Sequence, residues 1–212
     1  MSQRPGLFTI FILYAASLAL ADPITYDVIV NTSAISGTSG SLEFQFNPGG
    51  LDTQAASLQI LNFTSDGTLA GSPAITGDVS GTLPGTLAFD NGAFFNDYFE
   101  GFTFGTTLAF NVSLYGPALS LPDGVSTSGS TFAFSMFSDA AGTIPALTTD
   151  TTNGFAFTTD VNLDGTTTVT NSSAETTVQS ASSTVPEPSS LVLIGTVMVL
   201  MVALRFKRDV QG

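Results

Sequence analysis

Between residues 22 and 170, apolar and polar residues alternate with a period of two over many short runs. Successive side chains of a β-strand point to opposite faces, so such alternation produces one apolar face and one polar face. Gly, Pro, Asn and Asp separate the runs at intervals that suit hairpin connections, and no window has the period of a long amphipathic helix. The pattern predicts about eight to ten short strands. The clearest runs are 26–30, 42–46, 58–60, 87–89, 102–104, 108–114, 132–136 and 155–161.

Short strands of this number in one domain indicate an all-β fold, a single antiparallel β-sandwich of the jelly-roll-like kind over residues 22–170. The composition is that of a folded chain, because 43% of the residues are apolar and 10% are charged. Fifteen of the 18 phenylalanines lie between residues 22 and 184. They supply large core side chains in a protein that has no tryptophan.

The segment 171–184 departs from this pattern. It reads NSSAETTVQSASST, with 8 serines and threonines in 14 residues and no aromatic side chain. Because this composition supplies little for a core, we expect a flexible Ser/Thr-rich stalk.

The charges of the chain are segregated. The formal net charge is −13, and the four basic residues, Arg4, Arg205, Lys207 and Arg208, all lie near the two ends. Between residues 22 and 184 there are 15 acidic residues and no Lys, Arg or His. This distribution excludes side-chain ion pairs within that region and argues against a nucleic acid partner, which requires cationic side chains. The absence of Cys and His from the sequence excludes thiol chemistry and a Ser-His-Asp triad.

The N-terminal residues 1–21 have the form of a secretory signal peptide. Arg4 precedes an uncharged apolar stretch over residues 7–20, and Ala19-Leu20-Ala21 forms a small-residue cleavage site. The alternative is an N-terminal membrane anchor, for which the stretch of 14 residues is short.

A second uncharged run covers residues 188–204 and is followed directly by Arg205, Lys207 and Arg208. Its 17 residues would make a helix of about 26 Å, close to the thickness of a hydrocarbon core. Because basic residues beside a span stay on the cytoplasmic side, this single transmembrane helix would leave the acidic domain outside.

Pro186-Glu187-Pro188 stands immediately before that run. The motif, the apolar helix and the basic end together closely resemble the PEP-CTERM sorting signal of exopolysaccharide-producing bacteria. The resemblance implies that exosortase, a membrane-integral enzyme, recognises residues 185–212 and sorts the protein. An ordinary tail anchor with a proline-containing linker is the alternative.

A weaker resemblance covers more of the chain. The run 94–105, with residues 129–137 and 164–167, resembles an exported PEP-CTERM β-domain family without an assigned function. It implies the same β-domain and no activity.

Two groups of residues are candidates for ligand binding. Asp160, Asn162 and Asp164, followed by Gly165, match the start of a calcium-binding loop. Asn171 occupies the position where such a loop needs a bidentate acid, so a hairpin turn is the favoured alternative.

The second candidate is the aromatic segment 94–102. Tyr98, flanked by Asp97 and Glu100, would form a platform on which a sugar face could stack. The alternative is that the aromatic side chains anchor the segment to the core, since pockets are few per protein.

No catalytic pair is readable from the sequence. A glycan hydrolase needs two carboxylates at a defined separation, whereas Glu43 alternates with Leu42 and Phe44 and is expected to face solvent. We therefore expect no enzymatic activity and no cofactor, calcium being the one candidate.

These observations predict an exported structural or binding protein. It would begin as an inner-membrane-anchored precursor and reach the cell surface or extracellular matrix, in association with exopolysaccharide. A carbohydrate-binding module, with or without calcium, is the main alternative, and a carboxylate-based glycan hydrolase is the third.

Overall fold

The computed structural model describes residues 22–50 and 52–181. The predicted signal peptide, the Pro186-Glu187-Pro188 motif, the apolar run and the basic tail lie outside the described residues. Within the described ranges, no helix has the length and hydropathy needed to cross a membrane. The elements are β1 (Ile24–Asn31), η1 (Ser33–Ile35), β2 (Ser39–Pro48), β3 (Ser57–Ser65), β4 (Thr68–Leu69), β5 (Ala74–Thr76), β6 (Val79–Gly81), β7 (Leu87–Asp90), β8 (Asp97–Thr103), β9 (Thr107–Tyr115), α1 (Pro117–Ser120), β10 (Ser130–Phe137), β11 (Phe155–Val161), β12 (Thr167–Asn171) and β13 (Thr176–Ser180).

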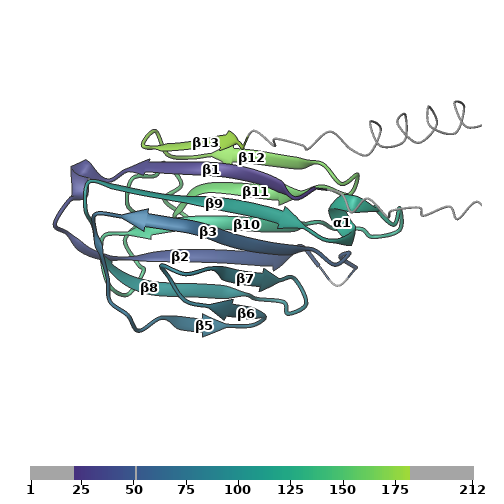
Figure 1. Cartoon of the computed structure of the whole chain (residues 1–212), viewed down its shortest axis with the longest axis horizontal. Coiled ribbons are helices and arrows are strands. Elements are labelled where there is room, and N and C mark those ends of the chain that lie inside the picture. The colour runs from purple at the N-terminus through teal and green to yellow at the C-terminus, as the bar shows by residue number, and fades with distance from the viewer. Residues whose placement is uncertain (1–21, 51, 182–212) are drawn as a thin grey trace, which may run out of the picture. The chain divides into compact units, whose positions relative to one another are not determined.

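The strands form two antiparallel sheets packed as a sandwich (Figure 1). A six-stranded sheet has the order β13-β1-β9-β3-β7-β6, and a seven-stranded sheet has the order β12-β11-β10-β2-β8-β4, with β5 also paired to β8. The predicted all-β antiparallel sandwich is confirmed. The predicted strand number is too low, because β4, β5 and β6 have only two or three residues each. Runs that short carry no readable alternation.

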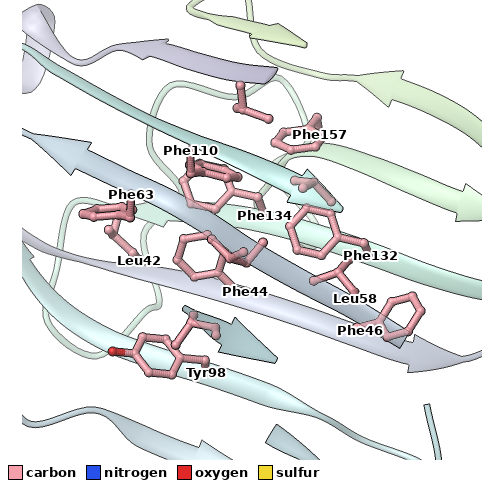
Figure 2. Packing of buried hydrophobic residues seen from close by; sticks show 14 of the residues in the cluster. Leu42, Phe44, Phe46, Leu58, Phe63, Tyr98, Phe110, Phe132, Phe134 and Phe157 are labelled. Atoms are coloured by element: carbon pink, nitrogen blue, oxygen red, sulfur yellow. The ribbon is translucent and has the colours of Figure 1, made fainter. Parts of the chain in front are cut away.

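Aromatic rings hold the two sheets together. The ring centroid of Phe44 on β2 lies 5.3 Å from that of Phe110 on β9 in the other sheet, and 4.9 Å from that of Phe134 on β10. Phe110 and Phe134 are 5.0 Å apart. Figure 2 shows these rings side by side, with Tyr98 at the edge of the cluster. The alternating phenylalanines of the sequence therefore converge from both sheets on one core.

The prediction of a stalk from residue 171 onward is wrong for residues 171–180. Asn171 ends β12, and residues 176–180 form β13, which lies beside β1 at the edge of the six-stranded sheet. Thr176 is buried and Val178 is half-buried against the core. The hydrogen bonds between neighbouring strands are made by main-chain groups, which every residue type except proline supplies in full. Threonine also suits strands because it is β-branched. A Ser/Thr-rich segment can thus complete a sheet edge without making a core of its own.

Candidate functional site

Strand β8 divides its polar residues between the two faces of the seven-stranded sheet. Tyr98 and Glu100 point into the sandwich and are 0% and 1% exposed, whereas Asp97 lies on the outer face. A buried ring cannot stack on a sugar, so the predicted sugar platform at Tyr98 is wrong. The alternative, in which the aromatic side chain anchors the segment to the core, is confirmed.

Glu100 is held inside the protein by hydrogen bonds. The Tyr98 hydroxyl donates to Glu100 Oε2 and accepts from the Leu83 amide at 3.1 Å. The Gly71 amide donates to Glu100 Oε1 at 2.8 Å. Burial raises the pKa of the Tyr98 hydroxyl above its ordinary value, and the hydrogen bond to Glu100 raises it further. This pair ties two loops to β8, which is a structural role.

On the outer face, Asp97 contacts a second carboxyl group, that of Glu43 on β2. The register places Gln45 directly opposite Asp97, and Glu43 opposite Phe99. Asp97 is 8% exposed, and its Oδ1 atom has no hydrogen-bond donor among the described residues. Burial first, and then the charge of Glu43 and a hydrogen bond with its carboxyl group, together raise the pKa of Asp97 to about 7.

The sequence did not reveal this pair. Alternation correctly places Glu43 on the outer face, but Glu43 is half-buried rather than free in solvent. The pairing depends on the register of β2 against β8, which joins residues more than 50 positions apart. Two carboxyl groups in hydrogen-bond contact also differ from a glycosidase pair, in which the carboxyl groups are about 5 Å or more apart.

The calcium-loop candidate forms a hairpin turn between β11 and β12. Asn162 and Thr166 close the turn, with a 2.9 Å hydrogen bond from the main-chain amide of Asn162 to the Thr166 carbonyl. Asp160 Oδ1 accepts from the Thr131 hydroxyl at 2.6 Å, and Asp164 Oδ1 accepts from the Thr166 amide at 3.0 Å. The side-chain amide of Asn162 donates hydrogen bonds to the hydroxyls of Thr166 and Thr168. The hairpin alternative is therefore confirmed, since the three candidate ligands bond to threonines.

Within the described parts of the chain, no group of three or more acidic, His or Cys residues is placed to hold a metal ion.

Several exposed aspartates bond to hydroxyls and main-chain amides where other proteins use ion pairs. Asp66 is the clearest example, because it accepts from the amides of Thr106 and Thr107 and from the Thr106 hydroxyl. These bonds, the Thr106 hydroxyl first, lower the pKa of Asp66 to about 2. Side-chain and main-chain donors thus stabilise the acids of a region without cations.

An open polar groove of about 330 Å³ lies beside the β11–β12 turn. Its lining includes Thr127, Thr131, Asp160 and Asn162, which offer hydroxyl, carboxylate and amide groups. The exposed Leu163 adds an apolar side chain. Groups of this kind can form hydrogen bonds with a hydroxylated ligand.

Comparison with known proteins adds no relative: no family model, no curated protein and no solved structure matches the chain.

Proposed function

We propose that the chain is an exported structural or binding protein that exosortase sorts to the cell surface or extracellular matrix, where it associates with exopolysaccharide. The observation that carries the proposal is the order of three features at the C-terminal end. Pro186-Glu187-Pro188, an apolar run and the basic residues Arg205, Lys207 and Arg208 follow one another in this order. The signal-peptide pattern of residues 1–21 supports the same direction of transport.

Two structural features are compatible with this role. The described residues form a packed β-sandwich whose charged groups are all acidic. Strand β13 ends at Ser180, six residues before Pro186.

The proposal includes a jelly-roll-like connectivity. The chain changes sheet between β1 and β2, between β2 and β3, and at each step from β7 to β10. Alternation of this kind between two antiparallel sheets supports a Greek-key arrangement.

Replacing Pro186, Glu187 and Pro188 together with alanine should leave most of the protein in the inner membrane at full length. The alanines remove the motif by which exosortase would recognise the tail, together with two prolines, a residue type that favours an extended backbone. Fractionation of inner membrane, outer surface and medium, followed by immunoblotting, measures the distribution. Alanine at Ser189 and Ser190 is the matched control, because it changes the adjacent residues and keeps the motif. Release of the motif variant at the native level would overturn the sorting proposal.

A carbohydrate-binding role is the second candidate, and the polar groove favours it. Asn162 to alanine should weaken binding to the exopolysaccharide of the producing strain by about fivefold, the expected effect of one lost hydrogen bond. Binding isotherms of the purified protein test this, with Gln59 to alanine, on the other sheet, as the control. Equal binding by both variants, or no binding by the native protein, would contradict this role.

A further inference from the structure

Two contacting carboxyl groups on the outer face of the seven-stranded sheet have no positively charged partner among the residues that the structure describes. Glu43 and Asp97 lie on neighbouring strands, and Asp97 Oδ1 is enclosed without a donor among the described residues. Burying a carboxylate is strongly unfavourable unless its charge is compensated. Residues 22–184 contain no Lys, Arg or His, so no side chain of this region can supply the compensating charge, whereas a proton or a cation from solvent can.

We propose that Glu43 and Asp97 form a binding site for a divalent cation, Ca²⁺, on the outer face of the β2–β8 strand pair. The two carboxylates would share the ion, which would replace the hydrogen bond between them. Unlike the calcium-loop candidate near Asp164, this site is built from two strands that are distant in sequence. The inference is independent of how the protein is sorted.

Amide side chains lie next to the pair on β2. Gln45 lies directly opposite Asp97 in the strand register, and its Oε1 atom accepts a hydrogen bond from Asn47 Nδ2 at 3.2 Å. Gln45 Oε1 would have to turn from Asn47 to reach the ion, whereas Asn47 Oδ1 already accepts a hydrogen bond from the Asn96 main-chain amide at 2.7 Å. Water would complete the coordination on the side open to solvent.

The donor set indicates calcium. The chain has no His or Cys, so imidazole and thiolate ligands for transition metals are missing. Mg²⁺ demands near-ideal octahedral geometry and gives up water reluctantly, whereas Ca²⁺ accepts irregular oxygen coordination. Two carboxylates with amide and water oxygens correspond to weak sites, with dissociation constants on the order of 1 mM.

A proton competes with the cation for this site. The raised pKa of Asp97 means that at neutral pH the pair holds a proton in part of the molecules. Calcium requires both carboxyl groups to be ionised, so binding should release a proton. Glu43 is the titratable neighbour whose charge acts on Asp97, while Gln45 and Thr76, the residues opposite Asp97 on β2 and β5, are uncharged.

The test measures the melting temperature of the full chain in detergent at pH 8, with and without CaCl₂. At about 10 mM Ca²⁺ we expect a rise in Tm of about 4 °C, and at most half of that with Mg²⁺. Calorimetric titration at pH 6 in two buffers of different ionisation enthalpy should show roughly one proton released per Ca²⁺ bound.

Substitutions locate the site. Asp97→Asn and Glu43→Gln keep the side-chain volume, so both variants should fold and lose the calcium-dependent rise. Asp27→Asn removes one negative charge from the outer face of β1 in the other sheet. This control variant should keep the calcium-dependent rise in Tm.

Four results would overturn the proposal. One is the absence of any rise in the native protein, which would mean that the proton alone compensates the pair. The second is an equal rise with Mg²⁺, and the third is retention of the calcium-dependent rise in both Asp97→Asn and Asp160→Asn; either would indicate unspecific screening of an acidic surface. The fourth is loss of the rise in Asp160→Asn with retention in Asp97→Asn, which would place the ion at the β11–β12 turn.

Discussion

Replacing Gly40 with alanine should destabilise the protein by about 3 kcal/mol or more, because no space exists for a methyl group at this position. A Cβ atom on Gly40 would lie 2.0 Å from the carbonyl oxygen of Phe137 and 2.8 Å from the Phe104 ring. Phe137 is on β10, and its partner in the register with β2 is Ser41. Since the nearest atom belongs to the main chain, relief requires β2 and β10 to separate, with loss of ladder hydrogen bonds at the centre of the sheet.

Urea denaturation followed by far-UV circular dichroism measures this effect. Gly101 to alanine is the control: it lies on the adjacent strand β8, where the nearest neighbour of a new Cβ atom is the Ala70 methyl group at 3.2 Å. That methyl group can shift slightly, so the control should stay within about 1 kcal/mol of the native protein. Similar stabilities for the two variants would contradict the prediction, because they would show that β2 and β10 leave room for a methyl group at Gly40.

Replacing Asp97 with asparagine should stabilise the metal-free protein at pH 8 by on the order of 3 kcal/mol. The pKa of Asp97 is about 7 in the folded protein and 3.8 as its ordinary value. The folded state therefore binds more protons than the unfolded state between these values, and stability falls as pH rises from about 4 to about 7. Asparagine has the same side-chain shape as aspartate and carries no charge, so the variant does not lose stability as the pH rises.

Denaturation midpoints measured in EDTA at pH 8 and at pH 4 check both the sign and the size of the stability difference between Asp97→Asn and the native protein. At pH 4 the difference between Asp97→Asn and the native protein should fall to within about 1 kcal/mol, because the native carboxyl group is then mostly protonated. Asp27→Asn, an exposed residue, should change stability by less than about 0.5 kcal/mol at pH 8. Equal stability of native protein and Asp97→Asn at pH 8 would contradict the raised pKa.

Calcium links this experiment to the proposed cation site. If Ca²⁺ compensates Glu43 and Asp97, the advantage of Asp97→Asn at pH 8 should shrink when the ion is added. A protein exported into a medium that contains calcium would then keep its acidic β-domain stable at neutral pH without any basic side chain of its own.

The parts of the fold that follow from local pattern were predictable from the sequence. Phe44, Phe110 and Phe134 each lie in an alternating run, and each is buried at the interface of the two sheets. The hairpin over residues 162–166 was also readable, because turn residues act within a few positions of each other. Strand β13 was not predictable from the sequence, because its serines and threonines join a sheet edge by main-chain hydrogen bonds, which composition does not reveal.

The sequence by itself determined that the protein is a β-sandwich with a phenylalanine core and a region of acids without cations. Only the tertiary structure decided what those acids do. Glu100 is turned inward to Tyr98, and Asp97, three residues earlier, is turned outward to Glu43. Alternation assigns each side chain to a face, but the register of distant strands assigns its neighbours. The chemistry of a carboxyl group depends on those neighbours, so the pair that we propose as a calcium site emerged only when β2 and β8 were placed side by side.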